Sequence, residues 1–352
     1  MTLHIFNPEH DIALASGKAN FTAPHAGRQL RHDLGWLPAC WKGQGDAVLV
    51  EDVDAAQLAC KRRKLEPGFF VDKDMLKSLP IDRVEPWGWN AALRAELLRH
   101  GVRADILPTE EDIAAIRNLS HRRTASWLLP QLRTEGTLGE AWECSSIEEV
   151  ESRLEQYGHL TLKAPWSSSG RGIRFLSHET PVENIHGWLR NLIRQQGSVM
   201  VEPYYNKVCD MGMEFISDGK GHVSYEGLSL FHTANGAYTG NIIATERAKR
   251  AKISRYLSLE LLDATQERIC QLLGEAFDGK YQGPFGVDMM VVGASPAACL
   301  LHPCVEINLR HTMGHVALAL GRKINPTDDD DIRRVMRIDY SNNCYKLNIK
   351  RL

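Results

Sequence analysis

The pattern of apolar and polar positions changes character about a third of the way along the chain. Short apolar runs at residues 3–6 and 47–50 predict strands, and apolar residues four positions apart over residues 89–97 predict an amphipathic helix. Strands that alternate with helices are typical of a parallel α/β unit. We therefore expect residues 1–118 to form an N-terminal domain of this kind.

A second pattern follows, in which helices and strands surround a loop rich in serine and glycine. The expected elements span residues 122–132, 147–157, 160–163, 173–176, 182–193 and 198–202. Residues 119–202 are therefore predicted to form a small α+β unit after the first domain.

The remaining residues, 203–352, are richest in strand patterns, and a long helix is expected near residues 257–277. Strands are expected near residues 213–216, 223–230, 285–292 and 300–307. This part is predicted to hold a mixed or antiparallel sheet rather than a doubly wound one. The acidic run from Asp328 to Asp331 is interpreted as the start of a late helix, where carboxylates favour the helix dipole.

Composition and charge narrow the function classes. Of 352 residues, 42 are lysine or arginine and 44 are aspartate or glutamate, so no overall basic field recruits nucleic acid. We find neither a signal-peptide pattern nor an apolar run of about 18 residues, which predicts no membrane span. The 8 cysteines form no Cys-x-x-Cys pair, and a reducing cytoplasm is expected. Cys299, His302 and Cys304 lie on a predicted strand, which favours buried thiols over zinc ligands.

A lysine at a strand end precedes the serine- and glycine-rich loop. Lys163 closes its strand, and Gly170 and Gly172 allow a tight turn and the approach of an anion to backbone N–H groups. A lysine in this place is suited to a phosphate. A plain hairpin with a solvated lysine explains the pattern equally well. The loop is not a Walker A motif, because Gly-Lys-Ser/Thr is absent.

The strand at residues 198–202 ends at Glu202 and leads into a loop. Pro203 offers only its carbonyl, and Tyr205 keeps its backbone N–H, so together they present an acceptor and a donor that suit a purine edge. Asp210 follows later in the same segment. If the chain folds back after Glu202, the Asp210 carboxylate is placed to accept hydrogen bonds from ribose hydroxyls. In isolation, this segment is better explained as an ordinary exit from a strand.

Two apolar strands late in the chain carry acids and an amide. Asp288 lies on the first strand, and Glu306 and Asn308 lie two positions apart on the second, so these two share a face. Carboxylate and carboxamide oxygens are ligands that Mg²⁺ prefers, and a buried charge is costly without a partner. Arg310 lies on the same face, and its planar guanidinium group adds several N–H donors. We favour a Mg²⁺ site over an internal salt bridge from Arg310 to one acid.

Together these three elements resemble the ATP-grasp superfamily of ATP-dependent carboxylate ligases. The resemblance covers about residues 119–320 and rests on one order of motifs: a lysine before a Ser/Gly loop, Val-Glu-Pro-Tyr-Tyr, then Asp and Glu-x-Asn-x-Arg. It implies an N-terminal α/β domain for the substrate (1–118), a small α+β lid subdomain (119–202) and a larger catalytic subdomain with a mixed or antiparallel sheet (203–352).

The resemblance also implies roles for individual residues. A basic residue before the lid, Arg123 or its neighbour Arg122, would contact a phosphate. The remaining ATP contacts would come from Lys163, Ser168, Ser169, Gly170, Gly172, Glu202, Pro203, Tyr205 and Asp210. Mg²⁺, or Mn²⁺ in its place, would be bound by Asp288, Glu306 and Asn308, and Arg310 and Lys163 would act in catalysis.

The implied reaction has two steps. A substrate carboxylate attacks the γ-phosphate of Mg-ATP to give ADP and an acyl phosphate, and an amine then displaces phosphate. The alternatives are a phosphotransferase on the same scaffold and a nucleotide-binding module without turnover. The expected partners are a small carboxylate and an amine, with neither nucleic acid nor membrane. The identity of the substrates and the oligomeric state are not encoded in any motif.

Three further segments carry weaker hypotheses. Residues 7–11 follow the first strand, where open parallel sheets bind ligands, or they form a simple turn. Residues 231–241 are interpreted as a polar loop, either over the acceptor substrate with His232, Asn235 and Tyr238 as contacts or as a long hairpin loop. His311 and His315 lie four apart on an expected helix, and the absence of a His-Glu-x-x-His pattern argues against zinc there.

Overall fold

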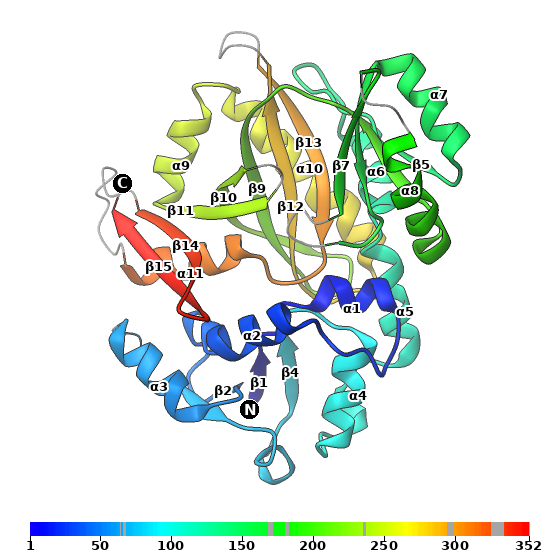
Figure 1. Cartoon of the computed structure of the whole chain (residues 1–352). Coiled ribbons are helices and arrows are strands. Elements are labelled where there is room, and N and C mark those ends of the chain that lie inside the picture. The colour runs from blue at the N-terminus through cyan, green and yellow to red at the C-terminus, as the bar shows by residue number, and fades with distance from the viewer. Residues whose placement is uncertain are drawn as a thin grey trace.

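The structure is a computed structural model that describes residues 1–351 except for 64, 66–67, 168–171, 180–182, 235–236, 294–298 and 325–333. It contains three sheets, and Figure 1 shows the N-terminal sheet below the two others. No helix within the described ranges is long and apolar enough to cross a lipid bilayer.

The N-terminal sheet is parallel, as the alternating pattern predicted. Its strands have the order β3-β2-β1-β4 and span β1 (Thr2–Ile5), β2 (Ala47–Leu49), β3 (Phe69–Val71) and β4 (Arg83–Pro86). The helices of this part are α1 (His10–Ser16), α2 (His25–Leu34), α3 (Val53–Arg62), α4 (Ala91–Arg99) and α5 (Glu110–Leu119). The strands are short, and β2 and β3 are wholly apolar, whereas β1 carries His4 and β4 carries Arg83 and Glu85. Figure 1 places α1 at the upper edge of this sheet, beside the rest of the molecule.

The small sheet is antiparallel and has the order β5-β8-β6-β7. Its strands are β5 (Trp142–Cys144), β6 (His159–Lys163), β7 (Ile173–Ser177) and β8 (Val199–Pro203), and its helices are α7 (Ile147–Tyr157) and α8 (Glu183–Gln196). Helix α7 has the predicted bounds, since Ser146 caps its start and Gly158, at φ 72°, ends it in the left-handed conformation. Leu160, Leu162 and Val201 pack with both helices into a separate core.

The large sheet is antiparallel and has the order β13-β12-β9-β10-β11-β14-β15. Its strands are β9 (Lys207–Ser217), β10 (Val223–Ala234), β11 (Ala237–Ile243), β12 (Gly283–Val292), β13 (Leu300–Asn308), β14 (Arg334–Ser341) and β15 (Cys344–Arg351). The associated helices are α6 (Arg123–Leu128), α9 (Glu246–Ile253), α10 (Leu259–Phe277) and α11 (Met313–Ile324). The sequence therefore predicted the strand-rich, antiparallel character of this part correctly.

The two faces of the large sheet differ in polarity. Phe215 and Phe285 stack at 5.1 Å between ring centroids, and Phe277 of α10 meets Phe285 edge to face at 5.1 Å, so one face packs into an apolar core. Residues of α6, among them Leu128, also join this core, although the sequence grouped α6 with the small unit. The opposite face carries the polar residues at alternate positions of the same strands.

Three local predictions differ from the structure. Residues 231–241 do not form a loop, because all but 235–236 lie in strands β10 and β11, which pair from Phe231↔Asn241 to Ala234↔Ala237. The predicted helix at 122–132 is shorter, since α6 ends at Leu128 and a 3₁₀ turn follows where Pro130 cannot donate a helical hydrogen bond. Strand β13 ends at Asn308, so Arg310 lies just beyond the strand rather than on it. The acidic run at residues 328–331 lies outside the described residues.

Candidate active site

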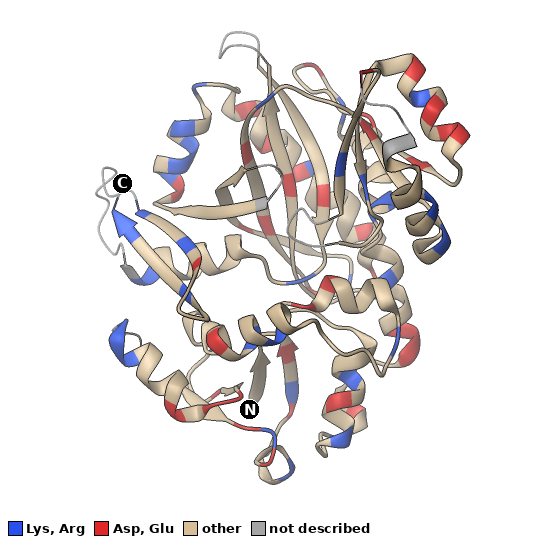
Figure 2. Cartoon of the chain, in the orientation of Figure 1, with Lys and Arg blue, Asp and Glu red and all other residues tan. Residues whose placement is uncertain are grey.

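Strand register brings acidic residues together on the polar face of the large sheet. Asp288 of β12 lies opposite Glu306 of β13 on one side and opposite Gly212 of β9 on the other. Asp210 and Glu214 flank Gly212 at two-residue spacing, so their side chains lie on the same face. Figure 2 shows acidic positions on neighbouring strands of the large sheet in the middle of the molecule.

The three predicted metal ligands are neighbours in space. The Asn308 side-chain N–H donates to Asp288 Oδ2 at 3.1 Å, and Asp288 pairs with Glu306 across the strands. Burial, with the nearby Glu306 as the next cause, raises the pKa of Asp288 to about 7. No group of three or more His, Cys, Asp or Glu side chains arranged for a metal exists among the described residues. Such a group would consist of His, Cys, Asp and Glu side chains only. The predicted set instead combines two carboxylates, those of Asp288 and Glu306, with the amide oxygen of Asn308.

Arg310 connects this set to the N-terminal domain. Its guanidinium donates to Asn308 Oδ1 at 2.8 Å and to Asp11 at 2.9 and 3.0 Å. Asp11 lies in α1, directly after the segment that follows β1, and Asn7 of that segment donates to the Gly88 carbonyl at 2.8 Å. The structure thus brings residues 7–11 to the edge of the acidic set.

Arg122, and not Arg123, links the small sheet to the acidic set. Its guanidinium donates to Glu306 Oε1 at 2.7 Å, to Ser167 Oγ at 2.9 Å and to the Ala164 carbonyl. Arg123 is exposed and donates to Asn118 Oδ1 at 2.6 Å, with Glu143 3.7 Å away. Because Arg122 is buried between the two sheets, it is the basic residue that geometry associates with the site.

Lys163 and Glu202 form a buried ion pair at the end of the small sheet. The Lys163 ammonium lies 2.6 Å from each carboxylate oxygen of Glu202, and both side chains are only 7% exposed. The Tyr205 ring, just after β8, lies 5.4 Å from the His302 ring of β13, so this end of the small sheet faces the large sheet. Next to it, the Tyr205 hydroxyl accepts from the Glu140 N–H at 3.0 Å, while Pro203 ends β8 opposite Leu160.

Two further predicted site residues, Asp210 and Gly172, lie among the described residues near the site. Asp210 accepts from Lys207 at 2.6 Å and from the Thr233 hydroxyl at 2.6 Å. The Gly172 carbonyl accepts from the Ala164 N–H at 2.8 Å, and a Cβ at Gly172 would lie 2.5 Å from Ser167 Oγ, so this position requires glycine. Ser168, Ser169 and Gly170 lie outside the described residues.

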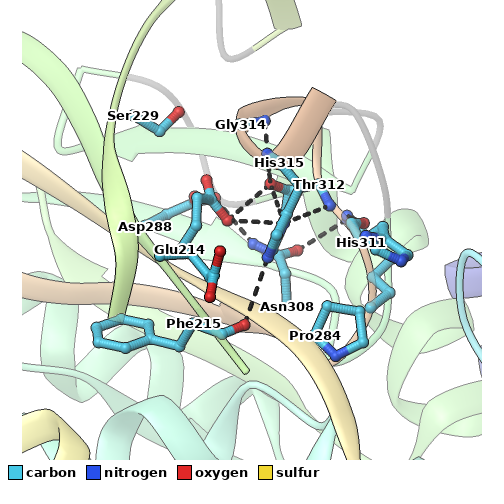
Figure 3. A network of polar contacts seen from close by, with 12 residues as sticks. Glu214, Phe215, Ser229, Pro284, Asp288, Asn308, His311, Thr312, Gly314 and His315 are labelled. Carbon is cyan, nitrogen blue, oxygen red and sulfur yellow. Dashed lines mark hydrogen bonds and ion pairs between the residues drawn. The ribbon is translucent and has the colours of Figure 1, made fainter. Parts of the chain in front are cut away.

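Sequence reasoning missed a buried network around Glu214 on the same face. Figure 3 shows Glu214, Thr312 and His315 pointing toward one another. The Thr312 hydroxyl donates to Glu214 Oε2 at 2.8 Å, and His315 Nδ1 lies 3.1 Å from the same oxygen. A Cβ at Gly314 would lie 1.8 Å from Glu214 Oε1, so the glycine leaves the room that this carboxyl group fills. From the sequence, His315 was considered on its own, and the signal for Glu214 was an isolated acid in an apolar strand.

The protonation of this network follows from its geometry. The Thr312 backbone N–H donates to His315 Nδ1 at 3.1 Å, so this nitrogen is the acceptor and Nε2 carries the proton toward the Phe215 carbonyl. Burial raises the pKa of Glu214 to about 8 and lowers the pKa of His315 to about 4. Near pH 7 both groups are therefore neutral, with the proton on the Glu214 carboxyl group.

Comparison with known proteins shows similarity in three dimensions only. No family model matches the sequence, and no curated protein matches it. The biotin carboxylase domain of Hydrogenobacter thermophilus 2-oxoglutarate carboxylase, solved with MgADP, ADP and bicarbonate, superposes with a TM-score of 0.56 at 14% identity, covering 86% of this chain and 71% of that chain. Biotin carboxylase from Campylobacter jejuni, solved with a β-γ-ATP ligand, gives 0.53 at 14% identity, covering 96% and 75%.

A longer protein gives a similar result. Rhizobium etli pyruvate carboxylase superposes with a TM-score of 0.53 at 14% identity, and the match covers 96% of this chain but 31% of that one. At such identities the similarity establishes the fold. The chain has the ATP-grasp fold that its motifs predicted, preceded by a parallel α/β domain.

Proposed function

We propose that this protein is an ATP- and Mg²⁺-dependent ligase that activates a substrate carboxylate as an acyl phosphate and joins it to an amine, with release of ADP and phosphate. The observation that carries the proposal is the convergence of Asp288, Glu306 and Asn308 on one sheet face with Arg122 beside them. This arrangement places hard oxygen ligands and a cation where the two sheets meet.

The acidic set fits a divalent cation on electrostatic grounds. Asp288 is partly buried opposite Glu306, and burial together with the Glu306 charge raises its pKa to about 7, so an added positive charge is favourable there. A divalent cation supplies that charge, and two carboxylates plus a carboxamide are the donors that Mg²⁺ or Mn²⁺ accepts. Asp288, Glu306 and Asn308 would therefore hold Mg²⁺, which when bound neutralises charge on the nucleotide phosphates.

The remaining residues have roles in binding and orientation. Lys163 and Arg122 lie on the small-sheet side and supply positive charge for the phosphates, while Glu202, Pro203 and Tyr205 line the exit of β8 and would hold the adenine. Asp210 would accept from the ribose. Gly172, with Ser168, Ser169 and Gly170, would close over the phosphates as part of a lid at residues 119–202. Arg310, held by Asp11, would orient the acyl group.

The structural neighbours support this proposal. Two of them were solved with adenine nucleotides, and the neighbour from Hydrogenobacter thermophilus also carries magnesium and bicarbonate. They share only the fold with this chain, so they do not identify its carboxylate and amine substrates. We propose that both are small molecules bound between the N-terminal domain (1–118) and the large sheet (203–352).

Release of ADP tests the proposal. The purified protein is incubated with Mg-ATP and a panel of amino acids, short peptides and polyamines, singly and in pairs. The ligase predicts ADP and phosphate only when a carboxylate and an amine are both present, and no activity in Glu306→Ala. A stable phosphorylated product from a single acceptor would instead show a phosphotransferase. If the protein neither turns over substrate nor binds Mg-ATP, the proposal is wrong, because the chain then has the fold without nucleotide chemistry.

A further inference from the structure

The segment between β13 and α11 is attached to the N-terminal domain. It comprises residues 309–312, directly after Asn308, and the His311 N–H donates to the carbonyl of Trp87, the residue after β4, at 2.8 Å. The Trp87 N–H in turn donates to the carbonyl of Ile5, the last residue of β1, at 2.6 Å. The segment thus joins the backbone hydrogen bonds at the carboxyl ends of two neighbouring parallel strands.

Open parallel sheets hold ligands at this position. In the strand order β3-β2-β1-β4, the chain passes from β1 to β2 on one side and returns to β4 on the other, so the order reverses between β1 and β4. Asp11, which follows β1, accepts from Arg310, and Trp87, which follows β4, lies 6.0 Å from His311 between ring centroids. Two consecutive residues of the chain itself therefore occupy the place where the sequence analysis considered a ligand.

The His311 ring is an aromatic anchor at this position. It lies 4.7 Å from the Trp41 ring and 5.3 Å from the His315 ring, and the residue is only 8% exposed. Its Nδ1 atom is buried and has no hydrogen-bond partner among the described residues, and burial lowers the pKa of His311, so the ring is neutral. The ring therefore contributes packing between the two parts of the molecule rather than a charge.

Arg310 is held by the same attachment. Its Nη1 donates to the His311 carbonyl at 3.1 Å, and its Nε and Nη2 donate to Asp11 at 3.0 and 2.9 Å. Nη2 also donates to Asn308 Oδ1 at 2.8 Å, which connects the guanidinium to the predicted metal ligands. Because His311 is bound to the N-terminal domain, a shift of its backbone would move the guanidinium relative to Asn308.

We propose that His311 is a positioning residue of the ligase: its ring fastens residues 309–312 to the N-terminal domain and thereby fixes the Arg310 guanidinium beside Asn308. The role of Arg310 in the reaction rests on the proposed function, whereas the hold on its guanidinium does not. The N-terminal domain (1–118) then does more than bind a substrate, since the ends of β1 and β4 set the direction of the arginine that orients the acyl group.

Nuclear magnetic resonance on the full chain measures the hold on the guanidinium directly. In protein labelled with ¹⁵N-arginine, the Arg310 Nε–H signal is assigned by its loss in Arg310→Lys, and donation to Asp11 is expected to slow its exchange with solvent. His311→Ala removes the anchor and should speed this exchange at least about 10-fold, whereas His311→Phe keeps an aromatic ring and should stay within about 2-fold of the wild type. The larger ring has room because His311 borders a pocket of about 910 Å³.

Leu97→Ala is the matched control for loss of stability. Leu97 is 1% exposed and belongs to a separate core of the same domain, so its truncation leaves a cavity away from residues 309–312. Its Arg310 signal should exchange as in the wild type. If His311→Ala does not fold, Trp41→Leu takes its place, because it loosens the packing from the other side of the ring. Unchanged exchange in the folded anchor variant, or equally fast exchange in Leu97→Ala, would overturn the proposal.

The rate of ADP release connects this hold to the proposed reaction. With a carboxylate and an amine that the wild type turns over, His311→Ala should lower kcat about 10-fold and change the KM for ATP less than about 2-fold, because the nucleotide residues are untouched. His311→Phe should restore kcat. A raised KM for ATP with unchanged kcat, or an equal loss of kcat in Leu97→Ala, would contradict a positioning role. If the wild type turns over no pair, the proposed function fails, and the exchange of the Arg310 signal still decides whether His311 holds the guanidinium.

Discussion

The two sheets that meet at the candidate active site satisfy their buried charges in different ways. On the small sheet, Lys163 and Glu202 neutralise each other, with contacts of 2.6 Å to both carboxylate oxygens. On the large sheet, Asp288 and Glu306 are like charges on paired strands, and the pKa of Asp288 rises to about 7. The small-sheet pair is complete as it stands, whereas on the large sheet Arg122 neutralises Glu306 and Asp288 accepts from the neutral Asn308 amide.

This difference indicates how each region would respond to a nucleotide. A phosphate that approaches Lys163 has to compete with Glu202. Nucleotide binding on the small sheet would therefore replace the contact between Lys163 and Glu202 with one between Lys163 and the phosphate. Mg²⁺ that approaches this set would offset the burial and the Glu306 charge that raise the pKa of Asp288, while it competes with Arg122 for Glu306. We therefore expect the large sheet to provide most of the metal-dependent binding energy, and the small sheet to provide positioning and closure.

The largest effect should come from removing a carboxylate of the large sheet. Glu306→Ala is expected to lower turnover at least about 1,000-fold, since it removes a metal ligand and frees Arg122. Circular dichroism should show that the variant is folded, with a melting temperature below that of the wild type because the buried Arg122 loses its partner. Activity within a few-fold of the wild type would mean that the acidic set is not the catalytic centre.

The next effect separates two adjacent arginines. Arg122→Ala is expected to lower turnover about 100-fold, because Arg122 joins the small sheet to Glu306 and positions both. Arg123→Ala provides the control, and less than about a 2-fold change is expected because this side chain is exposed. Steady-state rates of ADP release measure both, and the opposite ranking of the two variants would show that Arg123, rather than Arg122, is the phosphate contact.

A smaller effect concerns the ion pair of the small sheet. Lys163→Met should weaken nucleotide binding and lower the free energy of unfolding by about 3–5 kcal/mol, because it leaves the Glu202 charge buried and alone. In the double variant Lys163→Met/Glu202→Leu most of the unfolding free energy should return, while nucleotide binding should not. Chemical denaturation measures the free energy of unfolding, and ATP titration measures nucleotide binding. A double variant as unstable as the single one would contradict a self-contained pair.

The smallest effect is a pH dependence of stability without metal. The folded-state pKa of Asp288 is raised from 3.8 to about 7, and that of Glu214 from 4.5 to about 8, so the native state binds more protons than the unfolded state in this window. Stability from these groups is complete below the unfolded values and is lost as the pH rises through about 7 and 8. The melting temperature in EDTA should therefore fall by several degrees from pH 5 to pH 8. Asp288→Asn should flatten the slope, and a melting temperature that rises over this range in the wild type but not in the variant would refute the assignment.

The sequence predicted most of the fold because its signals are local. Strand and helix periodicity marked α7 and the β12–β13 pair, and the two-residue spacing of Glu306 and Asn308 placed them on one face. Residues 231–241 were misjudged because glycine and polar side chains suggested a loop, whereas β10 and β11 pair with each other there, and β9 and β14 extend the sheet at Phe231 and Asn241. Neighbouring strands override local propensity.

The candidate site was predictable only where one strand carried its residues. Glu214, Thr312 and His315 come together from β9 and the start of α11, 98 residues apart in the chain, so no spacing rule reveals them. The partnership of Arg310 with Asp11 joins two domains, and the choice of Arg122 over Arg123 depends on which side of α6 faces Glu306. These contacts follow from tertiary packing, which a single sequence does not display.

Calorimetric titration with ATP, in Mg²⁺ and in EDTA, tests the central claim most directly. The account predicts that the wild type binds ATP tightly in Mg²⁺ and at least about 10-fold more weakly in EDTA, and that the double variant Asp288→Asn/Glu306→Gln binds equally weakly in both. ATP binding by the wild type that does not depend on Mg²⁺, or a Mg²⁺ effect that survives in the double variant, would contradict it.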